Sequence, residues 1–154
     1  MKRFTLISIT LIVVYVLWLP TFSFSQEAVS DSSLQIKTMT TNELVNAAKK
    51  YAPQITVEQA KQEIEAGSVV ILDVREPKEF KQGHLPGAIN IPRGLLEFKV
   101  LDKIPDQNSN IVVYCKVGGR GALAAKTLRI LGYNNVKNIA GGWEAWLKAG
   151  FDVE

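Results

Sequence analysis

The stretch NIVVYCKVGGR, residues 110–120, joins an apolar run to a cysteine and two adjacent glycines, and it decides the fold class. Residues 110–114 show no alternation of polar and apolar side chains, which is typical of a strand buried on both faces in a parallel sheet. A helix is predicted over 121–131, with its apolar residues on one face and Gly132 as its end. A strand, a tight loop and a helix in this order predict an α/β fold.

Similar elements precede and follow this stretch. An apolar run over 69–72 ends at Asp73, and a weaker run covers 136–139. Thr56 followed by Gln59 forms a capping box that predicts a helix reaching Ala66. Strands that alternate with helices favour a parallel sheet covered by helices on both faces.

Cys115 occupies the position where such folds bind ligands, since it directly follows the strand over 110–114. Adjacent glycines let consecutive backbone N–H groups face one point, and a helix N-terminus adds partial positive charge. We expect the Cys115 thiolate to be the anion held there. A helix N-terminus contributes only about 0.3–1 kcal/mol, so we expect N–H bonds, Lys116 and Arg120 to supply further stabilisation.

The single cysteine among 154 residues excludes an internal disulfide, a CxxC redox pair and a thiolate-rich zinc site. No metal or organic cofactor is expected. Two of the 18 lysines and arginines lie in an N-terminal segment that we expect to be removed, which brings the net charge from +3 to +1. That balance gives no support to nucleic-acid binding.

Residues 1–25 have the layout of a secretory signal peptide. Lys2 and Arg3 precede an apolar run over 4–19, and the small residues Ser23 and Ser25 predict cleavage before Gln26. The alternative is an uncleaved membrane anchor, and in either case we expect export, to the periplasm or the outside. Residues 26–53 are interpreted as a linker with a short helix, and residues 54–154 as the domain.

Four segments of the chain resemble the rhodanese-like family, in the expected order over about residues 54–150. They are LDVREPKEF (72–80), GHLPGAINIP (83–92), CKVGGR (115–120) and IAGGWEAW (139–146). The resemblance implies a mostly parallel five-stranded sheet with helices on both faces. It also implies sulfur transfer in two displacements, in which Cys115 takes a sulfur from thiosulfate or a related anionic donor and passes it to a thiol or to cyanide.

The resemblance further implies roles for the loop. Its backbone holds the transferred sulfur, Lys116 attracts the donor and Arg120 closes the loop. The sequence departs from the family at Lys116, where arginine is frequent, and at Gly121, where many relatives carry a small hydroxyl residue. The substrate-binding residues so predicted are Lys116, Val117, Gly118, Gly119 and Arg120.

Residues outside the loop receive structural interpretations. Asp73 and Arg75 are expected to form an ion pair near the site rather than to bind substrate, and His84 to make structural hydrogen bonds. The cysteine and its loop also resemble the sites of proteins with two other functions. A cysteine phosphatase or arsenate reductase needs five residues between cysteine and arginine, and this chain has four. A non-catalytic module that carries sulfur or binds a partner stays open, although the cysteine favours an enzyme.

Overall fold

The structure is a computed structural model, and it describes residues 38–154. The predicted signal peptide lies outside these residues, as does the linker up to residue 37. The sheet contains five strands in the order β1-β5-β4-β2-β3, and every neighbouring pair is parallel. The predicted fold class is therefore confirmed. The strands are β1 (Gln54–Ile55), β2 (Val70–Asp73), β3 (Ile89–Asn90), β4 (Asn110–Tyr114) and β5 (Asn135–Ile139).

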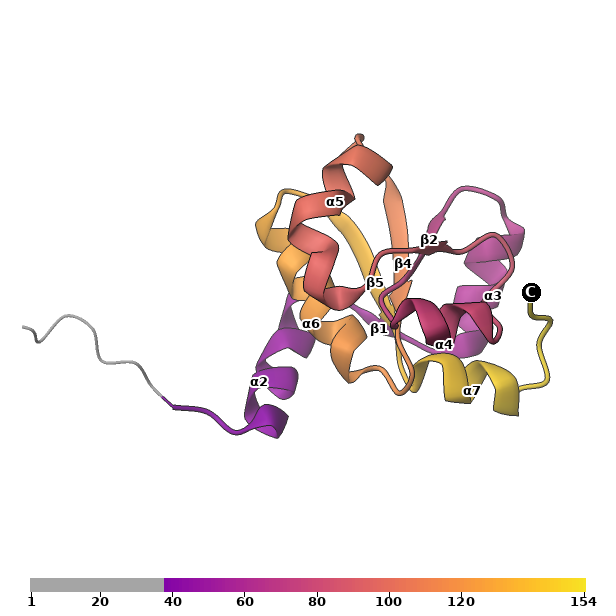
Figure 1. Cartoon of the computed structure of the whole chain (residues 1–154), viewed down its shortest axis with the longest axis horizontal. Coiled ribbons are helices and arrows are strands. Elements are labelled where there is room, and N and C mark those ends of the chain that lie inside the picture. The colour runs from indigo at the N-terminus through magenta and orange to yellow at the C-terminus, as the bar shows by residue number, and fades with distance from the viewer. Residues whose placement is uncertain (1–37) are drawn as a thin grey trace, which may run out of the picture. The chain divides into compact units, whose positions relative to one another are not determined.

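Helices cover both faces of this sheet, α5 and α6 on one side and α3 and α7 on the other (Figure 1). The α5–α6 side buries Leu96, Val100 and Leu128 against the strands. The other side buries Ala60 and Trp146. The helices are α2 (Thr41–Ala48), α3 (Val57–Glu65), α4 (Pro77–Lys81), α5 (Leu96–Lys103), α6 (Gly119–Ile130) and α7 (Gly142–Lys148), with short 3₁₀ turns η1 (Lys49–Tyr51) and η2 (Arg93–Leu95).

The capping signals in the sequence mark real helix starts. Thr56 accepts a hydrogen bond from the N–H of Gln59, whose side chain in turn accepts from the N–H of Thr56. Thr40 and Glu43 form the same reciprocal pair at the start of α2. These bonds satisfy N–H groups that have no partner inside the helix.

Helix α2 belongs to the compact unit, which runs from Thr38 to Glu154. The sequence predicts that the domain begins at residue 54 and that the preceding helix lies in a linker. In the structure α2 packs against α6, and a Cβ atom on Gly119 would lie 3.8 Å from the Val45 side chain. The N-terminal helix thus reaches the loop that carries Cys115. Within residues 38–154, no helix combines the length and the apolar character needed to cross a membrane.

Strand register brings three polypeptide segments to one edge of the sheet. Asp73 at the end of β2 pairs with Tyr114 at the end of β4, and Val113 of β4 pairs with Asn138 of β5. The segments that follow these strands are therefore neighbours, because parallel strands end on the same side. They carry Arg75, Cys115 and Gly142, respectively.

Candidate active site

Cys115 lies at the centre of the loop between β4 and α6. Its side chain is almost fully buried, with an exposed fraction of 1%, and its Sγ accepts a hydrogen bond of 3.2 Å from the N–H of Gly118. Gly118 has a φ of +94°, a conformation that residues with a side chain rarely adopt. The left-handed turn at Gly118 therefore directs a backbone donor at the sulfur, as the glycine pair predicts.

Helix α7 fixes the orientation of the loop backbone. The N–H of Trp143 donates to the Cys115 carbonyl at 2.8 Å, and the N–H of Glu144 donates to the Lys116 carbonyl at 3.0 Å. In a trans peptide the carbonyl and the following N–H point in opposite directions. Since α7 binds these two carbonyls, the N–H groups of Lys116 and Val117 are turned to the other side of the loop.

The contact with α7 is so close that it requires glycine. A Cβ atom on Gly142 would lie 3.0 Å from the Cys115 carbonyl carbon, closer still to its oxygen, and 3.1 Å from the Gly118 nitrogen. Gly142 also has a φ of +55°. The two glycines at 141–142, which belong to the fourth segment of the resemblance, thus let the start of α7 touch the active-site loop.

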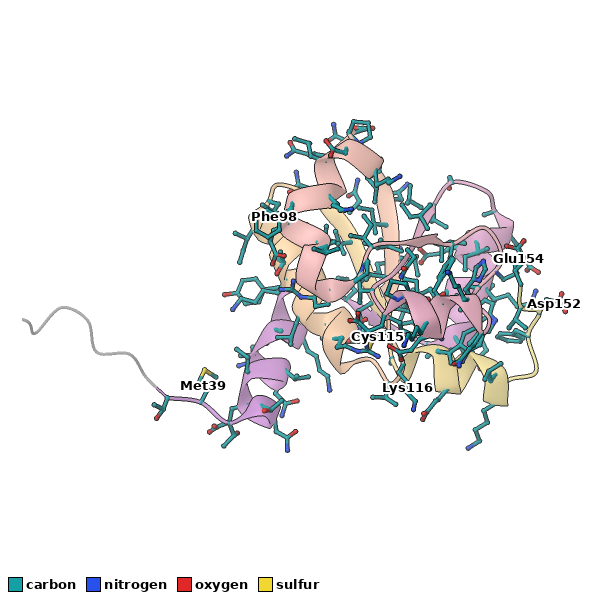
Figure 2. The ribbon with its side chains drawn as sticks, viewed as in Figure 1. Met39, Phe98, Cys115, Lys116, Asp152 and Glu154 are labelled. Carbon is teal, nitrogen blue, oxygen red and sulfur yellow. The ribbon has the colours of Figure 1, made fainter. Side chains whose placement is uncertain are left out.

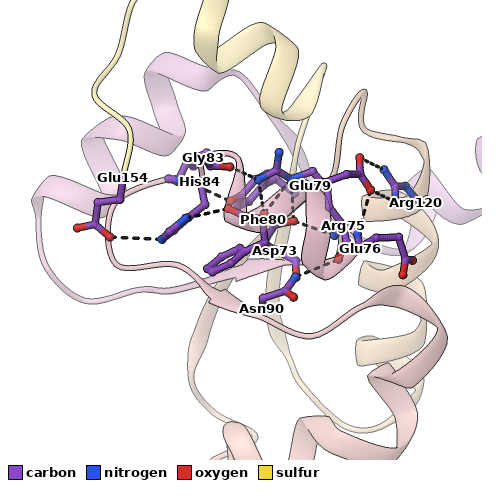
Figure 3. A network of polar contacts seen from close by, with 12 residues as sticks. Asp73, Arg75, Glu76, Glu79, Phe80, Gly83, His84, Asn90, Arg120 and Glu154 are labelled. Atoms are coloured by element: carbon purple, nitrogen blue, oxygen red, sulfur yellow. Dashed lines mark hydrogen bonds and ion pairs between the residues drawn. The ribbon is translucent and has the colours of Figure 1, made fainter.

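Arg120 points to α4 and is held there by Glu79 (Figure 3). Its two terminal nitrogens bind the two carboxylate oxygens at 2.8 and 2.9 Å. This bond lowers the pKa of Glu79 to about 2, so the carboxylate is charged at neutral pH. We expected Arg120 to place its charge on the thiolate. The structure pairs its guanidinium with Glu79, a residue that the sequence alone does not single out, and a contribution of Arg120 to the thiolate stays a prediction.

Asp73 and Arg75 form the expected ion pair, and it is buried. Arg75 Nε and Nη2 bind the Asp73 carboxylate at 2.8 and 2.7 Å, and Nη2 also donates to the Gly83 carbonyl at 2.7 Å. The guanidinium lies 4.4 Å from the ring centre of Trp143 on α7. The pair therefore joins the segment after β2 to the turn after α4 (Figure 3) and, through Trp143, to α7.

His84 makes the structural contacts that its turn-like context predicts. Its Nδ1 lies 3.2 Å from the Phe80 carbonyl, its ring stacks on Phe80, and its backbone exchanges two hydrogen bonds with Glu154. These contacts connect the last residue to the turn after α4, apart from the cysteine loop.

Beside the loop lies a pocket of about 120 Å³, lined by Arg75, Glu79, Gln82, Lys116 and Trp143. Figure 2 shows Lys116 at the surface next to Cys115. The Lys116 ammonium lies 3.7 Å from the Glu144 carboxylate, and both side chains are more than half exposed. Arg75, Arg120 and Lys116 thus each have a carboxylate partner, which is Asp73, Glu79 and Glu144, respectively.

The predicted site residues are together, although their individual roles stay predictions. Residues 116–120 surround Cys115, with the Val117 side chain 60% exposed at the tip. Sequence reasoning missed Glu79, Gln82 and the contribution of Trp143 to the pocket. A signal existed only for Glu79 and Trp143, since both lie within segments that carry the resemblance.

Comparisons with known proteins agree with this geometry. The family model of the rhodanese-like domain matches residues 56–149. A protein of Arabidopsis thaliana named thiosulfate sulfurtransferase 16, chloroplastic, is 43% identical over 93 residues, covering 54% of this chain and 78% of the relative. The human thiosulfate:glutathione sulfurtransferase is 31% identical over 109 residues, covering 63% and 95%.

Among solved structures, a protein of unknown function from Rhodopseudomonas palustris, described as a possible tyrosine phosphatase, superposes with a TM-score of 0.67. It is 32% identical and covers 78% of this chain and 98% of that chain.

The chain belongs to the rhodanese-like domain family. That family assignment accounts for the parallel sheet and for the cysteine at the end of β4. Within the family, the chain is a sulfurtransferase.

Proposed function

We propose that this sulfurtransferase takes sulfur from thiosulfate or a related anionic donor and passes it to a thiol. One observation carries the proposal: Cys115 Sγ accepts an N–H bond from Gly118 while α7 turns the carbonyls of Cys115 and Lys116 away. A sulfur anion at this point meets donors rather than carbonyl oxygens. That environment suits both a thiolate and the persulfide anion formed from it.

In the first displacement the Cys115 thiolate attacks the outer sulfur of thiosulfate. The new S–S bond forms as the bond between sulfur and the sulfonate breaks, and sulfite leaves with the electron pair. In the second, the acceptor thiolate attacks the terminal sulfur of the persulfide. The Cys115 thiolate leaves, so the enzyme returns to its starting state with no external oxidant or reductant.

The pocket beside Lys116 is the proposed approach for both partners. Because Cys115 is 1% exposed, the reacting sulfur of the donor must enter the loop while the rest of the donor stays outside. Lys116 lines the pocket, and its ammonium is more than half exposed and only loosely paired with Glu144, so it is the cation that an anionic donor would meet. The Trp143 ring and the Gln82 amide offer a surface to an organic thiol.

The proposal is tested by mass spectrometry of the intact protein. After incubation of the reduced protein with thiosulfate, we expect a gain of one sulfur atom that cyanide removes. The gain should be absent in Cys115→Ser. Failure of the folded wild-type protein to gain sulfur from thiosulfate or an organic persulfide would support the non-catalytic module instead.

A phosphatase activity is the alternative that the Rhodopseudomonas structure's description brings forward. Phosphate transfer needs an arginine that binds the phosphate inside the loop. Here both terminal nitrogens of Arg120 bind Glu79. We therefore expect no hydrolysis of aryl phosphates under conditions in which the persulfide forms.

We also propose that the chain is exported and cleaved after Ser25. The support is the order of charged, apolar and small residues within residues 1–25. N-terminal sequencing of the protein from the producing cell should begin at Gln26. An intact chain in the membrane fraction would instead support the anchor.

A further inference from the structure

Asn138 on β5 is a buried amide in contact with the active-site loop. Its exposed fraction is 1%, and its Nδ2 donates to the Gly118 carbonyl at 3.3 Å and to Gln54 Oε1 at 2.7 Å. Within residues 38–154, its Oδ1 is the buried side-chain nitrogen or oxygen that has no hydrogen-bond partner in the protein. Buried side-chain acceptors without a protein partner are uncommon, and this one belongs to the amide that binds the Gly118 carbonyl.

The orientation of this amide follows from its neighbours. Exchanging the amide oxygen and nitrogen would place Oδ1 against two acceptors, the Gly118 carbonyl and Gln54 Oε1. With Nδ2 in that place both contacts are hydrogen bonds. The cost is the unpaired Oδ1, which faces Gly121 on α6. A Cβ atom on Gly121 would lie 3.3 Å from the Asn138 Cγ and closer still to Oδ1.

The hydrogen bond from Asn138 to the Gly118 carbonyl acts between the two adjacent glycines of the loop, where the backbone has the greatest conformational freedom. The peptide between Gly118 and Gly119 joins two residues without side chains, so sterics oppose its rotation less than elsewhere. The Gly118 carbonyl points to α6 and β5, so the Gly119 N–H points the opposite way, and a rotated peptide would exchange these two directions. Two donors resist that rotation, the N–H of Ala122 at 2.9 Å and Nδ2 of Asn138.

We propose that Asn138 is a positioning residue that locks the Gly118–Gly119 peptide, so that the loop presents N–H groups to the Cys115 thiolate and persulfide. Only the part of this proposal that concerns the persulfide rests on the proposed function. It also explains the departure at Gly121. The Asn138 amide fills the space that a side chain at this position would need, so Gly121 and Asn138 fit as a pair.

The test compares Asn138→Ala and Asn138→Asp with a control on the same strand, Asn135→Ala. Asn135 is exposed and binds the Asn108 carbonyl at the opposite edge of the sheet. The measurement is the pH dependence of Cys115 alkylation by iodoacetamide, followed by single-turnover persulfide formation from thiosulfate. Loss of one hydrogen bond of ordinary net strength should slow persulfide formation by about tenfold in Asn138→Ala.

A purely structural role would lower stability without moving the pH profile of alkylation. We expect the midpoint of that profile to move to higher pH in Asn138→Ala and further in Asn138→Asp, where a carboxylate faces the Gly118 carbonyl. The Asn135→Ala profile should equal that of the wild type. A folded Asn138→Ala protein with the wild-type midpoint would overturn the proposal.

Gln54→Leu tests the same proposal if the Asn138 variants do not fold. This change removes the second acceptor of Nδ2 at a half-buried position, and we expect a smaller midpoint shift in the same direction. No shift would overturn the proposal. Alkylation needs no sulfur donor, so a wild-type protein that forms no persulfide would contradict the proposed function while the midpoints still test Asn138.

Discussion

Helices α7 and α4 both hold the active-site loop, α7 by its backbone and α4 by a side chain. Backbone N–H groups at the start of α7 bind the carbonyls of Cys115 and Lys116, whereas Glu79 on α4 binds the guanidinium of Arg120. A backbone contact is sensitive to shape, since a single added Cβ displaces it. A side-chain contact can be removed without moving the peptide. Changes on the α7 side should therefore act on loop geometry, and changes on the α4 side on charge.

Gly142→Ala should have the largest effect on the rate of sulfur transfer, because the new Cβ would overlap the Cys115 carbonyl. A displacement of about 1 Å at a reacting group can cost about 100-fold in rate, so we expect at least that loss of persulfide formation from thiosulfate. Rapid-mixing kinetics followed by mass spectrometry measures the rate. Circular dichroism shows whether the variant is folded.

Gly150→Ala is the matched control for that change. Gly150 also has a positive φ, +71°, but a Cβ there would meet no atom within 4 Å. We expect this variant to lose about 1–3 kcal/mol of stability from backbone strain while its rate stays at the wild-type value. If Gly142→Ala keeps the wild-type rate, the shape argument for α7 is wrong.

Asp73→Ala tests the buried ion pair of Asp73 and Arg75, which binds the turn after α4. The change leaves the Arg75 guanidinium without its carboxylate at a position where its side chain is 3% exposed. Breaking one half of a buried ion pair should lower the free energy of unfolding by about 3–5 kcal/mol, measured by urea denaturation. Asp152→Ala, at an exposed position, should change it by less than about 0.5 kcal/mol. Equal losses in the two variants would contradict the structural role of the pair.

Glu79→Gln tests the ion pair between Glu79 on α4 and Arg120. We expect the effect of this change on the free energy of unfolding to depend on pH. Arg120 lowers the pKa of Glu79 from 4.5 to about 2, so the pair stabilises the fold above pH 4.5 and loses its effect as the pH falls through 2. Because both side chains are partly exposed, we expect a difference of only about 1 kcal/mol between wild type and variant at pH 7. Urea denaturation over this pH range should show the two curves converging below pH 4.5. A gap that stays constant to pH 2 would contradict the assignment.

The exposed pair of Lys116 and Glu144 should show the smallest effect. Its charges lie 3.7 Å apart in solvent, where ion pairs are weak and salt screens them. At low salt, Lys116→Ala should lower kcat/KM for thiosulfate by about threefold and Glu144→Gln should raise it by a similar factor, since ~0.6 kcal/mol corresponds to that ratio. Both effects should fade as salt increases. An effect of Lys116→Ala that persists at high salt would indicate direct contact with the donor.

The central strand, the loop and the helix after it could be predicted from the sequence because their signals are local. The apolar run over 110–114, the adjacent glycines and the capping box of Thr56 and Gln59 all act within a few residues. Strands β1 and β3 contain two residues each and give no periodic signal, so the count of five depended on the family resemblance.

The contacts that organise the site could not be predicted, because they join residues far apart in the chain. Glu79 and Arg120 are separated by 41 positions, and Asn138 follows Gly118 by 20. Nothing near Arg120 in the sequence shows that its charge is already paired. The closeness of Gly142 to Cys115 likewise depends on how β4 and β5 end side by side.

The burial of Cys115 also determines which oxidants can react with its thiol. Its sulfur is the chain's single thiol and is 1% exposed, so two copies cannot bring their cysteines together without opening the loop. A small oxidant such as hydrogen peroxide reaches the sulfur more easily than another protein does. With no second cysteine to form a disulfide, a sulfenic acid at this position depends on a small external thiol for its repair. The supply of small thiols around the protein therefore determines how long it stays an active catalyst.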